Sequence, residues 1–288
     1  MADLSQFTVQ NLFNIKGWVA VVTGGGTGLG LITAQALAAN GAKVYITGRR
    51  AEKLKEAELD DATSGGSIRG IQMDCTDKQS IQEGVKAIQE KFVNLLVNNA
   101  GRTSGNYGPK GFPTGDINSI SEELLNNHTF ENWLEIYKIN VASCYFTSAA
   151  FLPLLVAARD NGYSEAGSIL NISSIAGLTK DSLNGQFSYN ASKAATISLT
   201  KQLAVDFKRP GIEVRVNTLA PGFFPSEMNP IARDDGQQKD FFRNEWGIPF
   251  GRAGEAAEYA QAVLNFAKNG YITGSTLAID GGWLLAHA

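Results

Sequence analysis

Short apolar runs alternate with longer helical patterns along almost the whole chain. The apolar runs predict strands at 18–23, 43–47, 68–73, 93–97, 167–172, 212–219 and 272–279. The patterns between them predict helices at 28–40, 50–59, 78–91, 130–157, 188–208 and 255–267. Such alternation predicts an α/β fold, in which a doubly wound parallel sheet of about seven strands carries helices on both faces.

The length and composition of the chain suit one large α/β domain with a full core. It has 288 residues, of which 43% are hydrophobic, and no proline- or serine-rich linker divides it. We therefore expect a single domain over residues 1–288.

Two segments of this domain are expected to shape a ligand cleft. Residues 102–129, rich in Gly, Asn, Ser and Pro, form an insertion that either caps the cleft or makes a surface excursion. Residues 222–252 are interpreted as a substrate lid, although their aromatic side chains could instead belong to the core. These aromatics are Phe223, Phe224, Phe241, Phe242, Trp246 and Phe250.

Charge and cysteine content exclude several classes of function. The net charge is −3 and no basic cluster could follow a phosphate backbone, so nucleic acid is not expected as a partner. No apolar run reaches the roughly 20 residues of a membrane span, and residues 1–10 lack a signal peptide's charged start and apolar core. The default expectation is a cytosolic protein without a membrane partner. Cys75 and Cys144 have neither a disulfide framework nor metal-ligand spacing, and with only His128 and His287 besides, no metal site is expected.

A glycine-rich turn follows the first predicted strand directly and opens the first predicted helix. Its glycines let the backbone approach a pyrophosphate, and the first N–H groups of the helix point at it. The turn therefore predicts a Rossmann-like phosphate site, although a tight strand-to-helix turn is the plain alternative. The residues involved are Gly24, Thr27, Gly28, Leu29 and Gly30.

Tyr189 and Lys193 lie four residues apart in a helical pattern and so share a face. A charge about 6 Å from the phenol, at an effective dielectric of about 20, is worth roughly 3 kcal/mol, or about two pKa units. We therefore expect a phenol that serves as acid and base near neutral pH. A serine at 173 or 174 could hold the oxygen of a carbonyl or an alcohol beside it.

Together these motifs resemble the short-chain dehydrogenase/reductase family. Residues 23–30 and 98–101, then Asn140, Ser174, Tyr189 with Lys193, and Pro221-Gly222 occur in the order typical of that family. The resemblance extends over residues 16–282. It implies a nicotinamide cofactor and a catalytic tetrad of Asn140, Ser174, Tyr189 and Lys193.

Within the tetrad, two assignments depend on the resemblance. The catalytic serine of the family is the second of a pair, which selects Ser174 over Ser173, although the loop from Ser174 to Tyr189 is about two residues longer than in many relatives. In similar enzymes the residue that matches Asn140 holds a water that links the lysine to solvent. A buried structural amide is the alternative for Asn140.

The end of the second predicted strand indicates the cofactor. Gly48 stands where NAD-dependent relatives usually carry an aspartate, and Arg49 could pair with the 2′-phosphate of NADP(H). Arg49 and Arg50 could instead be solvated charges that open the next helix. The resemblance places Asp74 and Cys75 at the adenine, although Asp74 could equally cap the helix that follows.

The resemblance also assigns further residues to the cofactor. It implies that Lys193 holds the ribose beside Tyr189, and it places Ser226 where relatives often have a threonine near the nicotinamide amide. The remaining assignments are Asn98, Ala100, Gly101, Pro221 and Gly222.

The expected function is an NADPH-dependent carbonyl reductase, reversible as an alcohol dehydrogenase, with an apolar or bulky ketone as substrate. The segment from 221 to 228 also resembles the 3-oxoacyl reductases of rhamnolipid type. An NAD-dependent alcohol, sugar or steroid dehydrogenase and a non-catalytic nucleotide-binding regulator are the alternatives. Relatives are commonly tetramers, so a homo-oligomer (tetramer or dimer) is expected, with apolar residues at 279–285 suited to a subunit contact or to a core strand.

Overall fold

A central sheet organises the chain in the computed structural model, which describes residues 4–103, 112–226 and 239–288. Its order is β3-β4-β2-β1-β5-β6-β7-β8. All neighbouring strands pair in parallel except β3 and β4. The seven parallel strands are β1 Val19–Thr23, β2 Lys43–Gly48, β4 Ser67–Gln72, β5 Leu95–Asn98, β6 Ser168–Ile172, β7 Arg215–Pro221 and β8 Thr276–Ile279. The predicted α/β doubly wound sheet is confirmed, and the two-residue antiparallel strand β3 (Leu59–Asp60) is an addition to it.

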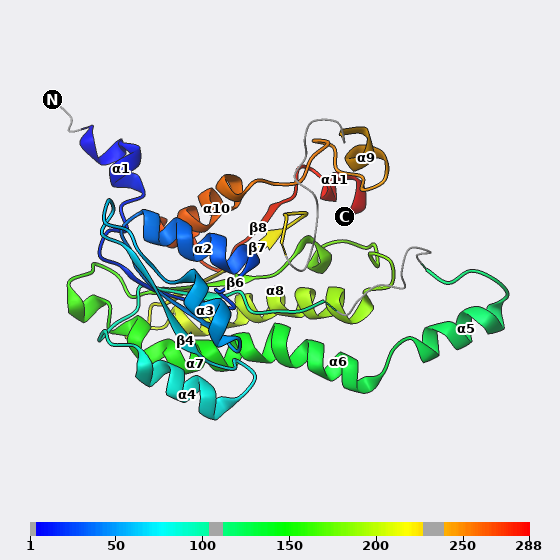
Figure 1. The fold of residues 1–288 in the computed structure, drawn as a ribbon, viewed down its shortest axis with the longest axis horizontal. Coiled ribbons are helices and arrows are strands. Elements are labelled where there is room, and N and C mark those ends of the chain that lie inside the picture. Colours follow the sequence, from blue (N-terminus) through cyan, green and yellow to red (C-terminus); the bar gives the residue numbers. More distant parts are fainter. Residues whose placement is uncertain (1–3, 104–111, 227–238) are drawn as a thin grey trace.

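The alternation of side chains along β1 explains why helices cover both faces of the sheet (Figure 1). Ala20 and Val22 pack into one core with residues of the helices α2, α3 and α10, whereas Val19 and Val21 pack into the other with residues of α7 and α8. Because both faces are buried, every residue of β1 is apolar except Thr23 at its end. These helices are α2 Gly28–Ala39, α3 Ala51–Ala57, α7 Ser143–Val156, α8 Phe187–Phe207 and α10 Ala256–Lys268.

The helix expected over 130–157 consists of three parts. It starts as α6 (Phe130–Tyr137), passes through a π-helical turn (Lys138–Ala142) and continues as α7. By length and composition alone, this helix is long and apolar enough to cross a membrane, so the expectation that no apolar run has that length was wrong. The core helix of a globular fold passes the same test, and α7 buries Phe151 and Leu155 against the sheet.

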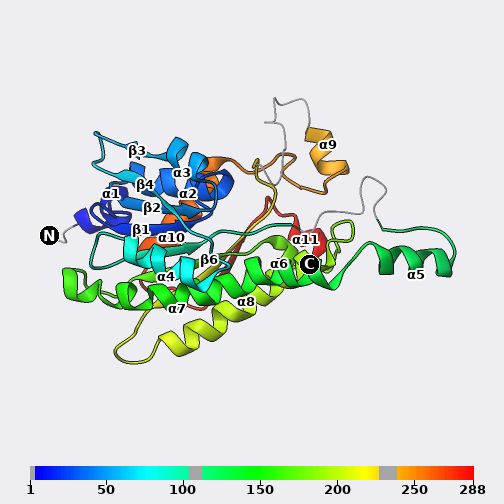
Figure 2. The same cartoon turned by 60° about the horizontal axis from the view of Figure 1, so that its bottom comes forward.

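The remaining helices differ from the predictions in their bounds and in the presence of short helices that were not predicted. The segment expected as one helix over 50–59 is α3, followed by β3, and α4 (Lys78–Ala87) begins and ends within its predicted range. The insertion contains a helix that the sequence did not indicate, α5 (Ile117–Asn126), which extends away from the sheet in two views (Figures 1 and 2). Two short helices remain, α9 (Lys239–Asn244) and α11 (Leu284–His287). Phe242 of α9 shares a buried cluster with Trp283, the residue before α11.

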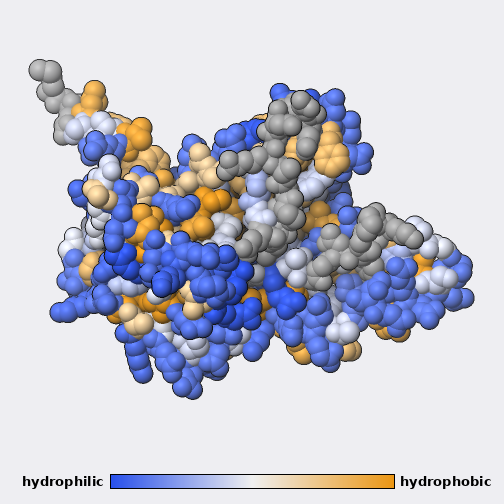
Figure 3. Space-filling model, viewed as in Figure 1, coloured by the Kyte–Doolittle hydropathy of each residue, from blue (hydrophilic) through white to orange (hydrophobic). Residues whose placement is uncertain are grey.

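A further short helix, α1 (Val9–Leu12), precedes the sheet and exposes apolar side chains, including Val9 and Leu12. It forms the orange-tinted projection beside the N-terminus in Figure 3. The expected insertion and lid can be followed only in part, because residues 104–111 and 227–238 lie outside the described ranges.

Candidate active site

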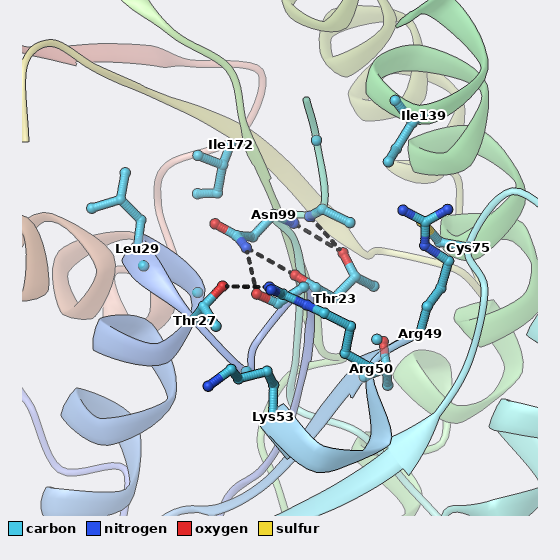
Figure 4. A pocket seen from close by; sticks show the side chains of 18 of the residues that line it. Thr23, Thr27, Leu29, Arg49, Arg50, Lys53, Cys75, Asn99, Ile139 and Ile172 are labelled. Carbon is cyan, nitrogen blue, oxygen red and sulfur yellow. Dashed lines mark hydrogen bonds between the residues drawn. The ribbon is translucent and has the colours of Figure 1, made fainter. Parts of the chain in front are cut away.

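The sheet order reverses at β1, where β2 lies on one side and β5 on the other. Ligands of such sheets bind in the crevice beyond the carboxyl ends of the strands at this point. A cavity of about 350 Å³ lies there (Figure 4). Of the residues assigned to the cofactor, Gly24, Thr27, Gly28, Leu29, Gly30, Arg49, Asp74, Cys75, Ala100, Gly101, Tyr189, Lys193 and Ser226 line it.

The glycine-rich turn runs from the end of β1 into α2, and two of its glycines have geometric reasons to be glycine. Gly24 has φ +65°, which side chains disfavour. An added Cβ at Gly30 would lie 2.3 Å from the carbonyl oxygen of Gly24 and 2.5 Å from the Asn99 amide nitrogen. The turn therefore brings bare backbone and the first N–H groups of α2 to the cavity wall, as a pyrophosphate requires.

Three cations come to the cavity from the end of β2 and the first turn of α3 (Figure 4). Arg49 and Arg50 follow Gly48, and Lys53 lies one helical turn later. Arg50 donates a hydrogen bond of 3.3 Å to the Thr27 hydroxyl, so it reaches across to the glycine-rich turn. Both arginines line the cavity, but both are exposed and Arg50 is the N-cap of α3, so the alternative of solvated helix-opening charges stays open. Lys53 was missed, although its spacing from Arg50 already placed the two on one helix face.

Asp74 and Cys75, which were assigned to the adenine, both line the cavity. Asp74 is not a helix cap. Asp77 caps α4 by accepting from the Ser80 backbone at 2.7 Å. Partial burial raises the pKa of Asp74, but hydrogen bonds from the backbone and hydroxyl of Thr76, helped by the charge of Arg49, outweigh it and hold that pKa below its usual range. A carboxylate is therefore kept ionised beside the cavity.

The structure corrects the assignment of Asn98, which does not line the cavity. Its buried amide donates to the Asn171 side chain at 2.8 Å and to the Ser148 hydroxyl at 3.0 Å, so it joins β5 to β6 and α7. Asn99 takes the place by the cavity and donates to the carbonyl oxygens of Thr23 and Gly24. Strand alternation could have separated the two, because adjacent residues at a strand end point to opposite sides.

Pro221 and Gly222, also assigned to the cofactor, do not line the cavity either. Pro221 ends β7, and a Cβ on Gly222 would lie 2.9 Å from Asp280, so Gly222 permits close packing after β7 and β8. Ser226, four residues later, does reach the cavity. After β7, the chain therefore reaches the ligand crevice at Ser226 and not at Pro221 or Gly222.

Tyr189 and Lys193 both line the cavity, but their electrostatics differ from the expectation. The Lys193 nitrogen lies 5.7 Å from the centre of the Tyr189 ring. Burial raises the pKa of Tyr189, and its contact with the Ser174 hydroxyl lowers it only in part. Burial also lowers the pKa of Lys193 to about 8. The predicted shift of the phenol toward neutral pH was therefore wrong for this structure, because desolvation by burial is the largest effect on its pKa.

The two adjacent serines have different roles in the structure. Ser173 is buried, and its hydroxyl donates to the backbone oxygen of Lys193 at 2.8 Å, which ties β6 to α8. The Ser174 hydroxyl instead contacts the Tyr189 phenol and accepts from the Ala176 backbone at 3.1 Å. Ser173, and not Ser174, is among the residues that line the cavity, but it is the Ser174 hydroxyl that contacts the phenol. This contact favours Ser174 as the residue that faces the reacting oxygen.

Asn140 lies at the centre of the π-helical turn and is buried. Its amide accepts from the Arg102 backbone nitrogen and donates to the Arg102 oxygen, both at 3.0 Å, and donates to the Ser192 hydroxyl at 2.9 Å. A Cβ on Gly101 would lie 3.0 Å from the Asn140 side-chain oxygen and 3.5 Å from the Lys193 nitrogen, so all three meet at Gly101. The contacts match a structural amide, and the water-holding role stays a prediction. Single π-turns within α-helices occur frequently at functional sites.

The lining residues fit a nicotinamide dinucleotide in two respects. The glycine-rich turn leaves space that a Cβ would fill, and the cations from the end of β2 and from α3 lie beside this turn, where Arg50 donates to Thr27. Tyr189 and Lys193 at the far side would contact the ribose and the reacting ring. The cavity thus offers donors for phosphates at one end and proton-transfer groups at the other.

Comparison with known proteins agrees with this geometry. Residues 18–237 match the family model of the short chain dehydrogenases. The chain is 34% identical to the short-chain dehydrogenase/reductase VdtF of Byssochlamys spectabilis over 313 aligned residues, covering 98% of this chain and 97% of the relative. It is also 34% identical to the 3-oxoacyl-[acyl-carrier-protein] reductase FabG of Escherichia coli over 273 residues, covering 93% of this chain and 98% of the relative.

Solved structures show the same architecture. The Pseudomonas aeruginosa RhlG/NADP active-site complex superposes with a TM-score of 0.76 at 28% identity, covering 94% of this chain and 98% of that one. The NADPH-dependent 3-quinuclidinone reductase of Rhodotorula rubra gives 0.74 at 27% identity, covering 99% and 97%. Fold, motif order and sequence similarity thus agree over nearly the whole chain, which belongs to the short-chain dehydrogenase/reductase family of oxidoreductases.

Proposed function

We propose that the protein is an NADPH-dependent carbonyl reductase that also runs in reverse as an alcohol dehydrogenase. The observation that carries this proposal is the contact between the Ser174 hydroxyl and the Tyr189 phenol. Tyr189 lines the crevice that the glycine-rich turn also borders. A group that donates a proton and a group that holds an oxygen are thus side by side. A carbonyl needs both when it is reduced.

The residues of the chain divide the work as follows. The nicotinamide cofactor, when bound, supplies the hydride. Ser174 holds the carbonyl oxygen by a hydrogen bond, and Tyr189 donates its proton to that oxygen as negative charge develops there. The raised pKa of Tyr189 suits reduction, because the phenol keeps its proton at neutral pH and can donate it to the oxygen as negative charge develops there. Lys193 lies 5.7 Å from the phenol ring and stabilises the phenolate that the transfer leaves behind.

NADPH is preferred over NADH in this proposal because of the charges at the end of β2. Arg49, Arg50 and Lys53 border the crevice, and Gly48 offers no carboxylate to repel a 2′-phosphate. Support comes from two structural neighbours whose descriptions name NADP and NADPH dependence. Asp74 is the one acid that lines the crevice among the described residues, and Thr76 already binds its carboxylate.

The proposed substrate is an apolar or bulky ketone. Aromatic side chains gather after β7 and in the last third of the chain, where Phe223 lies 4.9 Å from the Trp246 ring and 5.9 Å from the Trp283 ring. Such rings suit a large apolar group. Similar curated proteins are described as 3-oxoacyl reductases, which makes a 3-oxoacyl thioester one member of the test panel.

The experiment is a panel of ketones measured with NADPH and with NADH, including cyclic, aromatic and 3-oxoacyl compounds. We expect turnover with at least one bulky ketone and a higher kcat/KM with NADPH. If the protein binds NADPH but turns over no ketone of the panel with either cofactor, the result would support the alternative of a nucleotide-binding regulator. A higher kcat/KM for NADH would support the alternative of an NAD-dependent dehydrogenase.

A further inference from the structure

The last residues of the chain contact two segments from different parts of the sequence, one of which follows Ser174 directly. We call residues 283–288 the tail, residues 239–252 the distal segment and residues 175–186 the serine loop. The tail and the distal segment meet in a buried cluster that contains Trp283 of the tail and Phe242 of α9. The expected subunit contact at 279–285 does not use Trp283, because this side chain is 2% exposed within its own chain.

On one side, the tail binds the serine loop through its backbone. The carbonyl oxygen of His287 accepts hydrogen bonds from the Thr179 hydroxyl at 2.5 Å and from the Lys180 backbone at 3.2 Å. Thr179 and Lys180 belong to the loop that starts directly after Ser174. The position of His287 is therefore coupled to the position of this loop.

On the other side, the rings of the tail bind the distal segment. The imidazole of His287 stacks on the indole of Trp283, with 3.9 Å between centroids and 2° between planes. The Trp283 indole nitrogen donates to the backbone oxygen of Trp246 at 2.9 Å. Gly247 packs against the imidazole so closely that an added Cβ would lie 2.7 Å from it.

The contacts converge on a small buried cluster beside the catalytic serine. Trp283 shares this cluster with Phe242 and Ile248 of the distal segment and with Ile175, the residue after Ser174. Leu183 of the serine loop packs against the same cluster and holds a φ of +50°, which is costly for a residue with a branched side chain. Strain of this kind persists only where packing around it enforces it.

We propose that His287 is a positioning residue for substrate binding: it fixes the distal segment against the serine loop through Trp283 and Gly247. The aromatic cluster beside Ser174 is then held in place before a bulky ketone binds. A small ketone, which touches only Ser174 and Tyr189, does not depend on the tail. This inference rests on the proposed ketone reduction for its kinetic consequence, but not for its structural one.

The kinetic test compares His287→Ala with Leu285→Ala, a matched control whose side chain in the same helix is 91% exposed. Loss of a ring stack is expected to raise KM for a bulky ketone about three- to tenfold. The kcat for a small ketone and the Kd for NADPH should stay at wild-type values. His287→Phe, which keeps a ring for stacking, should restore most of the lost affinity. Equal KM values in His287→Ala and Leu285→Ala would overturn the proposal.

A second test needs no turnover and so separates this proposal from the proposed function. Brief trypsin treatment cuts after Lys239 and Arg243 of the distal segment when that segment detaches, and mass spectrometry locates the cuts. We expect faster cleavage there in His287→Ala than in Leu285→Ala, at equal NADPH binding. Gly247→Ala should also speed cleavage, because its new methyl group clashes with the His287 imidazole. The same substitution should have a smaller effect in a His287→Ala background, where that imidazole is absent. Unchanged cleavage in His287→Ala contradicts the proposed positioning role of His287, even if no ketone is ever reduced.

Discussion

The ammonium group of Lys193 donates a hydrogen bond to the backbone oxygen of Ile172 at 3.0 Å, two residues before Ser174. Ile172 ends β6, so this bond joins the catalytic helix α8 to the strand that carries the serine. Lys193 is only 6% exposed, and burial lowers its pKa to about 8. The fold therefore buries an ammonium group although burial disfavours its charged form. Such perturbed groups are typical of functional sites.

This buried lysine gives a prediction for stability against pH. Its pKa is about 8 in the folded chain against a reference of 10.5, so the unfolded chain binds more protons between these values. The free energy of unfolding of the wild type should therefore rise from pH 8 to 10.5, relative to Lys193→Met, by up to about 3 kcal/mol. Urea unfolding of both proteins without cofactor, at several pH values, measures this difference. A constant difference across the range contradicts it, whatever packing change the methionine introduces.

A second prediction concerns the proton donor. Tyr189→Phe removes the phenol and keeps the ring, so kcat for ketone reduction should fall by roughly 10²–10⁴, the usual contribution of a general acid. The Kd for NADPH, measured by fluorescence titration, should change little. Tyr271→Phe is the matched control, because Tyr271 is fully exposed. Wild-type kcat in Tyr189→Phe would rule out the proposed mechanism.

The glycine-rich turn gives a prediction about cofactor binding. Gly30→Ala places a methyl group within 2.5 Å of Gly24 and Asn99, so the turn must open. We expect NADPH affinity to fall at least tenfold and the midpoint of thermal unfolding to drop, as overpacking costs about 1–3 kcal/mol. Gly48→Ala is the control for the midpoint of thermal unfolding, because its Cβ would make an ordinary 3.6 Å contact with Leu54. Equal effects of the two substitutions would show that the close contact at Gly30 is unimportant.

Local pattern was enough to predict the sheet, because burial on both faces makes each parallel strand a short apolar run. β1 shows the reason: its alternate residues enter two different cores, so apolar residues are needed at both parities. Motif order then predicted most of the crevice. Asn98 was misplaced because strand alternation, which puts two adjacent asparagines on opposite sides, was not applied to Asn98 and Asn99.

The chemistry of Tyr189 could not be predicted from spacing alone. A separation of four residues places Tyr189 and Lys193 on one helix face, but it says nothing of how strongly each is desolvated. The π-helical turn at Asn140 was also invisible, since it depends on the contacts of its amide with Arg102 and Ser192. Both features arise from tertiary packing around the site.

Cofactor choice gives the final prediction. If Arg49 binds the 2′-phosphate, Arg49→Ala should weaken NADPH roughly ten- to a hundredfold, the worth of a charge-assisted bond, and leave NADH nearly unchanged. Gly48→Asp should go further and invert the preference. The structure leaves room for this side chain, since a Cβ at Gly48 meets only Leu54 at 3.6 Å. The new carboxylate would accept a hydrogen bond from the ribose of NADH and repel a phosphate that carries nearly two negative charges.

The measurement is kcat/KM for both cofactors on a single ketone. Arg50→Ala serves as the comparison, because Arg50 already donates to the Thr27 hydroxyl and its loss should disturb the glycine-rich turn for both cofactors. A selective loss of NADPH in Arg49→Ala, beside a shared loss in Arg50→Ala, would assign phosphate recognition to Arg49. If Arg49→Ala weakens both cofactors equally, or if the wild type already favours NADH, the charges at the end of β2 do not select the cofactor. The carboxylate of Asp74 on the same wall would then be the group to test at the adenosine end.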